Sequence, residues 1–436
     1  MTARAASTRS APLGLAFVLW DGRIGGAETF ALALTRALRG SGVDARVVFV
    51  RAAGPLGPAF LEDNIPFEEL RLKRGRATLS HPRRFAQAVA TAGADGAVLV
   101  AGGFLALALR VGGYRGRVAA VEHGAVLQLD RLPPRARLLR NVDRLSGACA
   151  VDVHVAVSDF LRERLKGGSR PVVTIPNGVD LDVYRPSTSP RPGDGFVIGC
   201  SSRLIPGKGV EDVIAATQRL VPRGACLRIA GDGPERPRLE RLAKQLGIHE
   251  RVEFLGWVRG PHAVADFWNT CDVAISAPND LVESFGLAAV EAMACGRPVV
   301  ATRSGGLPET IIHGRTGFVV NPRDTHSLTT ALLAYLDDAT LLMAHANAAR
   351  SWCEDRFDIR CCAAAYAGLF RSDSSPDRQT GWTEAKASDG GIEPTAEHTS
   401  ACQPGTGTVS TAPFGASCAA TRCRGRGEHA GHRSGQ

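Results

Sequence analysis

The alternation of short β-rich runs with helical stretches, in two successive series, most constrains what this chain can fold into. The first series predicts strands over 15–20, 45–50, 96–100, 118–122 and 153–157, with helices over 27–39 and from 158 onward. The second predicts strands over 196–200, 226–230, 252–255, 273–276, 298–301 and 317–320, with helices between them. Such βαβ patterning is typical of parallel sheets covered by helices on both faces. We therefore expect an α/β protein with two doubly wound, Rossmann-like domains.

Tandem domains of this kind bind ligands in the crevice outside the carboxyl ends of their strands. After Tyr184 the chain is rich in Pro and Gly, which indicates an interdomain linker. Beyond about residue 370 it is rich in Ser, Thr, Gly and Pro and poor in large apolar residues, which predicts disorder. The functional site is thus expected between the two domains, ahead of this tail.

The composition excludes several protein classes. The 436 residues include 11 cysteines, an odd number without any CxxC pair, so neither a disulfide framework nor a zinc site is expected. This cysteine usage favours a reducing cytoplasm. No window reaches the roughly 18 to 20 apolar residues that span a bilayer. The start of the chain lacks the small-residue cleavage site of a signal peptide.

The positive charge is concentrated in the first half of the chain. Residues 1–190 contain 26 Lys and Arg against 16 Asp and Glu, whereas the remainder is close to balanced. Basic clusters fall at 71–84 and 131–144, and the second is interleaved with leucines. A basic amphipathic helix there would lie on an anionic membrane surface such as the inner face of the plasma membrane, although an ordinary solvated helix face explains the pattern equally well.

The segment from Asp280 to Gly296 carries the most informative chemistry. Ser284 is expected to cap a helix over 285–295, whose first amides would form an anion site. Glu283 and Glu291 are eight positions apart, so on such a helix they would lie about 12 Å apart along its axis. That spacing suits two hydrogen-bonding roles on one extended ligand and is too long for a pair of glycosidase carboxylates.

A second loop carries two cations. Arg203 and Lys208 follow the first strand of the second series on a glycine-bearing loop that opens a helix. Two cations and a helix N-terminus can converge on a pyrophosphate, although two solvated loop cations are the plainer alternative.

The first series offers weaker signals. Gly25 and Gly26 follow its first strand, where residues without side chains let backbone amides approach a phosphate or sugar. His123 ends another strand and would face the crevice, although a lone histidine is more often structural. The second strand ends in Phe49-Val50-Arg51 without an acidic ribose ligand, which counts against a dinucleotide-dependent dehydrogenase.

Taken together, these motifs resemble those of the retaining glycosyltransferases of family 4, which have the GT-B fold. The resemblance covers about residues 13–370, and its most specific element is the pair of glutamates in a Ser-Phe-Gly-Leu setting. The motifs occur in this order: Gly25-Gly26-Ala27-Glu28, His123-Gly124, Ile175-Pro176-Asn177-Gly178-Val179-Asp180, Arg203 with Lys208, Gly231-Asp232-Gly233-Pro234, Glu283 to Glu291, and Ser304-Gly305-Gly306-Leu307-Pro308-Glu309.

The resemblance implies a role for each site residue. The donor diphosphate would be held by Arg203 and Lys208, the donor-sugar hydroxyls by Glu283 and the ribose hydroxyls by Glu291. His123 would lie near the transferred sugar. The remaining donor-binding positions would be Gly25, Gly26, Gly231, Val258, Phe285, Gly286 and Leu287.

The residue patterns and the resemblance together predict a domain plan, in which the tail resembles nothing in the family. A disordered start (1–12) would precede an acceptor-side domain (13–185), a linker (186–196) and a nucleotide-sugar donor domain (197–352). A helix over 353–370 would cross back to the first domain, followed by the disordered tail over 371–436, whose removal should leave activity intact.

The implied reaction is hexosyl transfer from a nucleotide-sugar to a glycan, lipid-linked or small-molecule acceptor, as in cell-surface polysaccharide or glycolipid biosynthesis. Cations and a helix dipole would stabilise the leaving group, so neither a metal nor another cofactor is expected, and neither is a nucleic-acid partner. Asp180-Leu181-Asp182 imitates a metal-binding DxD but falls in a loop before the linker. A nucleotide-sugar epimerase of similar fold and a non-catalytic sugar- or lipid-binding scaffold are the alternatives.

Overall fold

The computed structural model describes residues 12–22, 25–72, 80–100, 103–124, 149–189 and 195–371, with the side chains of 103 and 104 left aside. The expectations for the chain start, for the basic helix over 131–145 and for residues 372–436 lie outside these ranges. So do parts of the linker and of the basic cluster at 71–84. Within the described residues, no helix is both long and apolar enough to cross a membrane.

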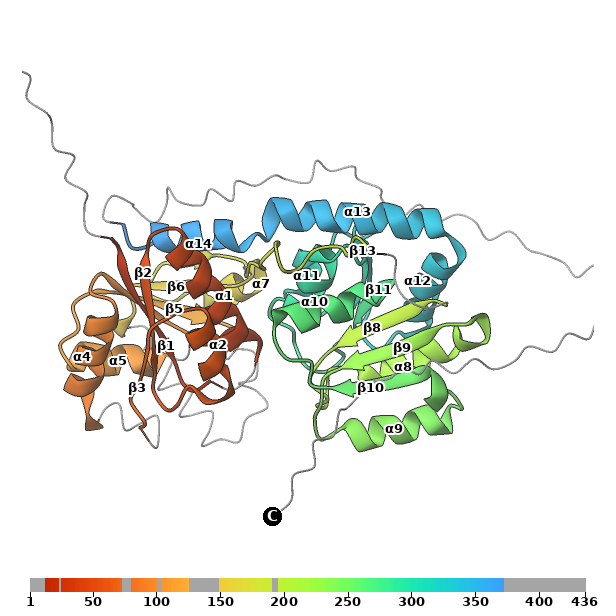
Figure 1. Cartoon of the computed structure of the whole chain (residues 1–436), viewed down its shortest axis with the longest axis horizontal. Helices are drawn as coiled ribbons and strands as arrows, with labels where there is room; N and C mark the ends of the chain where they lie inside the picture. The colour runs from red at the N-terminus through yellow and green to blue at the C-terminus, as the bar shows by residue number, and fades with distance from the viewer. Residues whose placement is uncertain are drawn as a thin grey trace, which may run out of the picture. The chain divides into compact units, whose positions relative to one another are not determined.

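The first domain is built on a seven-stranded sheet in which every paired strand is parallel (Figure 1). The strand order is β3-β2-β1-β4-β5-β6-β7. The strands are β1 (Gly14–Leu19), β2 (Asp44–Phe49), β3 (Phe67–Glu69), β4 (Gly96–Leu99), β5 (Arg117–Glu122), β6 (Val153–Ala156) and β7 (Val172–Thr174). The helices are α1 (Gly26–Gly40), α2 (Gly57–Glu62), α4 (Pro82–Ala92), α5 (Gly103–Val111) and α7 (Asp159–Leu165).

The second domain repeats the plan with six parallel strands in the order β10-β9-β8-β11-β12-β13. The strands are β8 (Val197–Ser201), β9 (Cys226–Ala230), β10 (Val252–Gly256), β11 (Val273–Ser276), β12 (Val299–Thr302) and β13 (Gly317–Val320). The helices are α8 (Val210–Gln218), α9 (Arg236–Gln245), α10 (Pro261–Asn269), α11 (Leu287–Ala294), α12 (Thr325–Asp337) and α13 (Ala339–Arg356). The predicted class, two Rossmann-like parallel-sheet domains, is confirmed.

Burial explains why these runs become strands. The apolar stretches of β1, β4 and β12 are buried along almost their whole length, because helices cover both faces of each sheet. In both sheets the strand order reverses beside the first strand of the domain, between β1 and β4 and between β8 and β11. Loops at the carboxyl ends of those strands are where α/β proteins place ligands.

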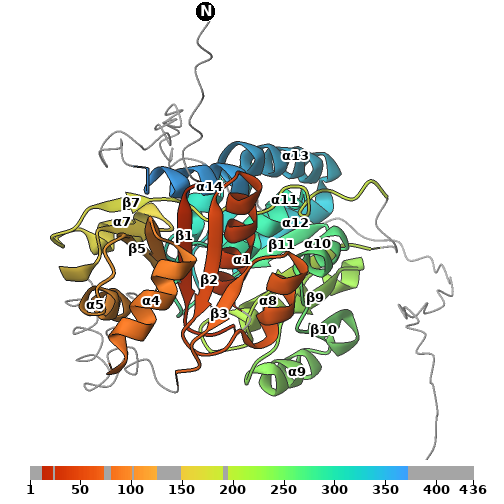
Figure 2. The same cartoon turned by 60° about the vertical axis from the view of Figure 1, so that its left-hand side comes forward.

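The last two helices of the described part of the chain connect the domains. Helix α13 packs against α11, whereas α14 (Ile359–Gly368) packs against α1, as Figures 1 and 2 show. Between them Asp358 caps α14 by accepting the Arg360 amide at 2.8 Å. Val179 forms backbone hydrogen bonds on both sides of that cap, with Phe357 at 2.8 Å and Ile359 at 3.0 Å. The chain therefore passes from the second domain to the first at residues 357–358.

Candidate functional site

The loops that leave β8 and β11 meet at an ion pair. The Lys208 ammonium lies 2.6 Å from Oε2 of Glu283, and both side chains are partly buried. Gly207 and Gly209, on either side of the lysine, adopt left-handed φ values of 85° and 68°. A Cβ at Gly209 would come 1.7 Å from the carbonyl oxygen of Ala277, so the loop can approach the end of β11 only with glycine there. The structure thus joins two residues that the sequence assigned to the donor.

Arg203, on the same loop as Lys208, has an exposed side chain, unlike the partly buried Lys208. The loop is anchored by backbone contacts, in which Leu204 N–H donates to Asp232 O at 2.9 Å. Gly231 is required at this crossing, since a Cβ there would lie 1.8 Å from Ser202 O. Close packing therefore requires glycine at Gly231, a residue predicted from the sequence to bind the donor.

The start of helix α11 differs from the expectation. The helix begins at Leu287, and its N-cap is Gly286 at φ 98°, a residue whose Cβ would collide with Leu307. The prediction that Ser284 caps the helix is wrong, because its hydroxyl instead donates to the carbonyl of His123 at 2.9 Å. Glu283 precedes the helix, so the expected 12 Å separation from Glu291 along a helix axis does not follow either.

Helix α11 still offers its N-terminus to the site. Its first intrahelical hydrogen bond is donated by Ala289 N–H to Gly286 O, so the Leu287 and Ala288 amides precede it. Phe285 is buried and packs edge-on against Phe357, with ring centroids 5.8 Å apart. This packing fixes the turn between Glu283 and the helix.

The N-terminus of α1 lies beside that of α11. Gly25 is the extended N-cap of α1, and a Cβ on it would come 2.6 Å from the Glu28 carboxylate. A Cβ on Gly26 would be 4.0 Å from Cδ2 of Leu287. The structure therefore brings Gly25 and Gly26 to the helix end that the sequence assigned to the donor phosphates, and both dipoles favour an anion there.

His123 follows β5 with its ring nitrogen Nε2 enclosed. The ring packs edge-on against Phe30 with centroids 5.8 Å apart. Burial lowers the pKa of His123 to about 4, so its imidazole is neutral at physiological pH. Among the described residues, none forms a hydrogen bond with Nε2. A neutral imidazole with an unused nitrogen suits a hydrogen bond to an uncharged hydroxyl.

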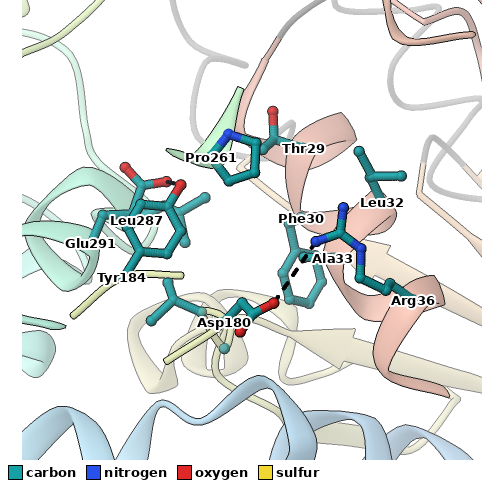
Figure 3. Close-up of a pocket in the computed structure, with 12 residues that line it drawn as sticks. Thr29, Phe30, Leu32, Ala33, Arg36, Asp180, Tyr184, Pro261, Leu287 and Glu291 are labelled. Atoms are coloured by element: carbon teal, nitrogen blue, oxygen red, sulfur yellow. Dashed lines mark hydrogen bonds and ion pairs between the residues drawn. The ribbon is translucent and has the colours of Figure 1, made fainter. Parts of the chain in front are cut away.

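Glu291 lines a pocket of about 40 Å³ between the two domains (Figure 3). Its carboxyl accepts a hydrogen bond from the Tyr184 hydroxyl through Oε1 at 3.2 Å. Burial raises the pKa of Glu291 to about 7, while the hydrogen bond from Tyr184 acts in the opposite direction. The other lining residues come from α1, from the loop before the linker and from the starts of α10 and α11: Thr29, Phe30, Leu32, Ala33, Arg36, Gly178, Val179, Asp180, Tyr184, Pro261 and Leu287.

The two aspartates of the DxD-like sequence serve the fold. Asp180 Oδ1 accepts the Asp182 amide at 3.1 Å, which closes a local turn. Asp180 also pairs with Arg36 at 3.8 Å, and Asp182 with Arg360 at 3.7 Å. In the described part of the chain, no three His, Cys, Asp or Glu side chains are grouped as a metal site requires.

The loop after β10 joins the same region. Gly231 N–H donates to Gly256 O at 2.7 Å, which ties this loop to the one after β9. Trp257 is exposed, whereas the predicted donor residue Val258 is partly buried against the main core. Helix α10 then begins at Pro261, a residue of the Glu291 pocket.

Sequence reasoning missed the contacts that cross between the domains. The Ser158 hydroxyl donates to Ser284 O at 2.7 Å. The Glu309 carboxylate accepts the Asp159 and Phe160 amides of α7 at 2.8 and 2.7 Å. Tyr184 was read only as the residue before the linker. Glu309 ends the motif that begins at Ser304. Because carboxylates are favoured at helix N-termini, a search for a carboxylate partner of α7 could have suggested its capping role.

Comparisons with known proteins place most of the chain in two matching sequence families. Residues 24–183 match the sequence family described as Glycosyltransferase Family 4, and residues 186–352 match Glycosyl transferases group 1. A GDP-mannose-dependent alpha-(1-6)-phosphatidylinositol monomannoside mannosyltransferase of Mycolicibacterium smegmatis is 36% identical over 283 residues, which covers 61% of this chain and 72% of that protein. A D-inositol 3-phosphate glycosyltransferase of Saccharomonospora viridis is 33% identical over 235 residues, covering 49% and 54%.

Solved structures share the fold. The crystal structure of Anabaena HepE in complex with UDP and glucose superposes with a TM-score of 0.71 at 23% identity, covering 83% of this chain and 100% of that one. A sucrose-phosphate synthase from Thermosynechococcus elongatus gives 0.68 at 20% identity, covering 83% and 98%.

Proposed function

The chain belongs to glycosyltransferase family 4, and we propose that it is a retaining, metal-independent member that uses a nucleoside-diphosphate sugar as donor. The observation that carries the proposal is the meeting of Lys208, Glu283 and the N-terminus of α11 at the point where the second sheet reverses its strand order. A cation and a helix N-terminus at that point form a site for a diphosphate.

In this proposal the second domain holds the donor. Lys208 and Arg203 neutralise the diphosphate, and the Leu287 and Ala288 amides add hydrogen bonds to it. The Glu283 carboxylate, already oriented by Lys208, accepts hydrogen bonds from the donor-sugar hydroxyls. Glu291 binds the ribose hydroxyls from the pocket that it lines.

The chemistry follows from where charge develops. As the glycosidic bond to the phosphate breaks, negative charge grows on the diphosphate and positive charge on the sugar ring. Fixed cations and amides stabilise the leaving group without reorganisation. The acceptor hydroxyl attacks the same face, and the departing phosphate oxygen takes its proton. The neutral His123 hydrogen-bonds the transferred sugar through Nε2 and carries no charge to oppose the oxocarbenium-like state.

For the acceptor we propose an anionic polyol or its lipid-linked form. Two observations favour it: residues 1–190 carry the excess of Lys and Arg, and the relatives named above act on inositol phosphates or phosphatidylinositol mannosides. Long-range attraction from the first domain would raise the encounter rate of such an acceptor. GDP-mannose is the first donor to test, because it is the donor of the Mycolicibacterium relative.

The test is an assay of sugar transfer to an inositol phosphate, with nucleotide-sugars supplied one at a time in excess EDTA. We expect transfer from one donor, with the anomeric configuration of the donor preserved in the product as read by nuclear magnetic resonance. Inversion at the anomeric carbon would contradict the retaining mechanism, and loss of transfer in EDTA would contradict metal independence. Equal rates with neutral and anionic acceptors would contradict the acceptor proposal.

A further inference from the structure

Tyr184 is fixed at every polar group that it has. Its amide donates to Asp180 O at 2.8 Å, and its carbonyl accepts from the Arg350 guanidinium at 2.7 Å. Its hydroxyl donates to Glu291 Oε1 at 3.2 Å, and the residue is only 5% exposed. Such a side chain has little freedom to leave its position, so its contact with Glu291 is a built feature of the fold.

Arg350 links the backbone of Tyr184 to the helix that carries Glu291. From α13, the same guanidinium nitrogen that binds Tyr184 O also binds Ala294 O at 2.7 Å. Ala294 is the last residue of α11, the helix that carries Glu291. One side chain therefore holds the backbone of Tyr184 and the end of this helix together.

The hydrogen bond from Tyr184 leaves the carboxyl of Glu291 with capacity for a ligand. A carboxylate offers about four acceptor positions on its two oxygens, and Tyr184 occupies one of them. Figure 3 shows the Tyr184 hydroxyl against the Glu291 carboxyl at one side of the pocket, with Thr29 and Phe30 across from them. Fixing the carboxyl beforehand reduces the entropy that a bound ligand must otherwise remove.

We propose that Tyr184 is a positioning residue for the donor nucleoside, whose hydroxyl holds the Glu291 carboxylate in the orientation that accepts hydrogen bonds from the ribose. The inference rests on the proposed function, because it assumes that Glu291 binds the ribose. It adds a specificity determinant for the sugar of the nucleotide that lies outside the motifs recognised in the sequence.

The experiment is titration calorimetry on the full chain with GDP, UDP and their 2′-deoxy counterparts. For the wild type, the ribose forms should bind more tightly than the 2′-deoxy forms. Tyr184→Phe should weaken binding of the ribose form about tenfold and reduce the preference over the 2′-deoxy form. Tyr114→Phe is the matched control, because its buried hydroxyl donates to Gly93 O at 2.8 Å in the first domain. That variant should bind both forms like the wild type.

A double variant shows whether Tyr184 acts through Glu291. Adding Tyr184→Phe to Glu291→Gln should cost no further affinity, since the carboxylate that the hydroxyl orients is already gone. Additive losses would overturn the inference, as would an unchanged ribose preference in Tyr184→Phe. Thermal unfolding of each variant checks that the fold is retained.

The outcomes separate this inference from the proposed function. Equal affinity of the wild type for ribose and 2′-deoxy forms would remove the ribose role of Glu291, and the inference with it, even if Tyr184→Phe does not fold. A wild-type preference that survives in Tyr184→Phe would overturn the inference alone.

Discussion

The two domains present their functional groups in different states. In the second domain two polar groups of the site are already held, Lys208 by Glu283 and Glu291 by Tyr184, whereas Arg203 is exposed. In the first domain the groups at the site are two glycines and His123, whose enclosed Nε2 has no hydrogen-bond partner among the described residues. The difference indicates that the second domain is preorganised at the site, whereas the first domain leaves hydrogen-bonding capacity there for a ligand.

The largest loss of activity should follow from removing the Lys208–Glu283 ion pair of the second domain. Lys208→Ala removes the cation next to the leaving group and leaves the partly buried Glu283 carboxylate unpaired. We expect kcat to fall about 10³-fold, measured as release of nucleoside diphosphate. Lys244→Ala, on the exposed face of α9, is the control and should keep wild-type turnover. Comparable losses in both variants would contradict the site assignment.

The second effect concerns stability and pH. The pKa of Glu291 is raised to about 7 in the fold from 4.5, so the folded state favours the protonated carboxyl. Stability is then lost as pH rises from about 4.5 through 7, on the order of 3 kcal/mol for the whole shift. Glu291→Gln should therefore gain stability relative to the wild type between pH 5 and pH 8, measured by chemical unfolding.

The exposed Glu250→Gln, in the turn before β10, is the control for this change and should show no such trend. A gain in the free energy of unfolding of Glu291→Gln at pH 5 that disappears at pH 8 would contradict a raised pKa for Glu291 in the folded protein.

A third effect tests the first domain. His123→Ala removes the hydrogen bond proposed for the transferred sugar, and we expect kcat to fall about a hundredfold while the affinity for nucleoside diphosphate is unchanged. Because burial lowers the pKa of His123 to about 4, its charge should not change across pH 5.5 to 8. A loss of nucleotide affinity in His123→Ala, absent in the exposed control His249→Ala, would move His123 to the donor side.

The smallest effect concerns the point where the two sides touch. Ser284→Ala removes the hydrogen bond to His123 O, and we expect kcat/KM to fall roughly fivefold. Ser284→Thr keeps the hydroxyl and should recover most of the activity, whereas the exposed Ser189→Ala should have no effect. Failure of threonine to restore activity would show that the hydroxyl is not what matters.

Much of the fold could be predicted from sequence because buried parallel strands appear as continuous apolar runs. The strands that escaped prediction, β3 and β7, are three residues long, and β3 contains two glutamates. Such short strands form because a neighbouring strand is already in place, which no local pattern records. The same applies to the break at Phe357, which depends on Val179 pairing beside it.

The site was predictable by residue type and less so by contact. The chemistry of the cations and carboxylates marked them as candidates for a donor site, yet the partners that these side chains contact are distant in sequence. Tyr184 and Glu291 are 107 positions apart, and Ser158 and Ser284 are 126 apart. The Ser284 cap failed because serine is a common N-cap, whereas here Gly286 provides the left-handed turn and Ser284 bonds across to the first domain.

The most direct test of the donor site is thermal unfolding of the wild type and of Lys208→Ala with a panel of nucleoside diphosphates and nucleotide-sugars, with and without EDTA. We expect at least one nucleotide to raise the midpoint of thermal unfolding of the wild type equally with and without EDTA. We expect Lys208→Ala to lose this shift. A shift that survives in Lys208→Ala, or one that requires a divalent cation, would contradict the proposed donor site. So would the absence of a shift with every nucleotide tested.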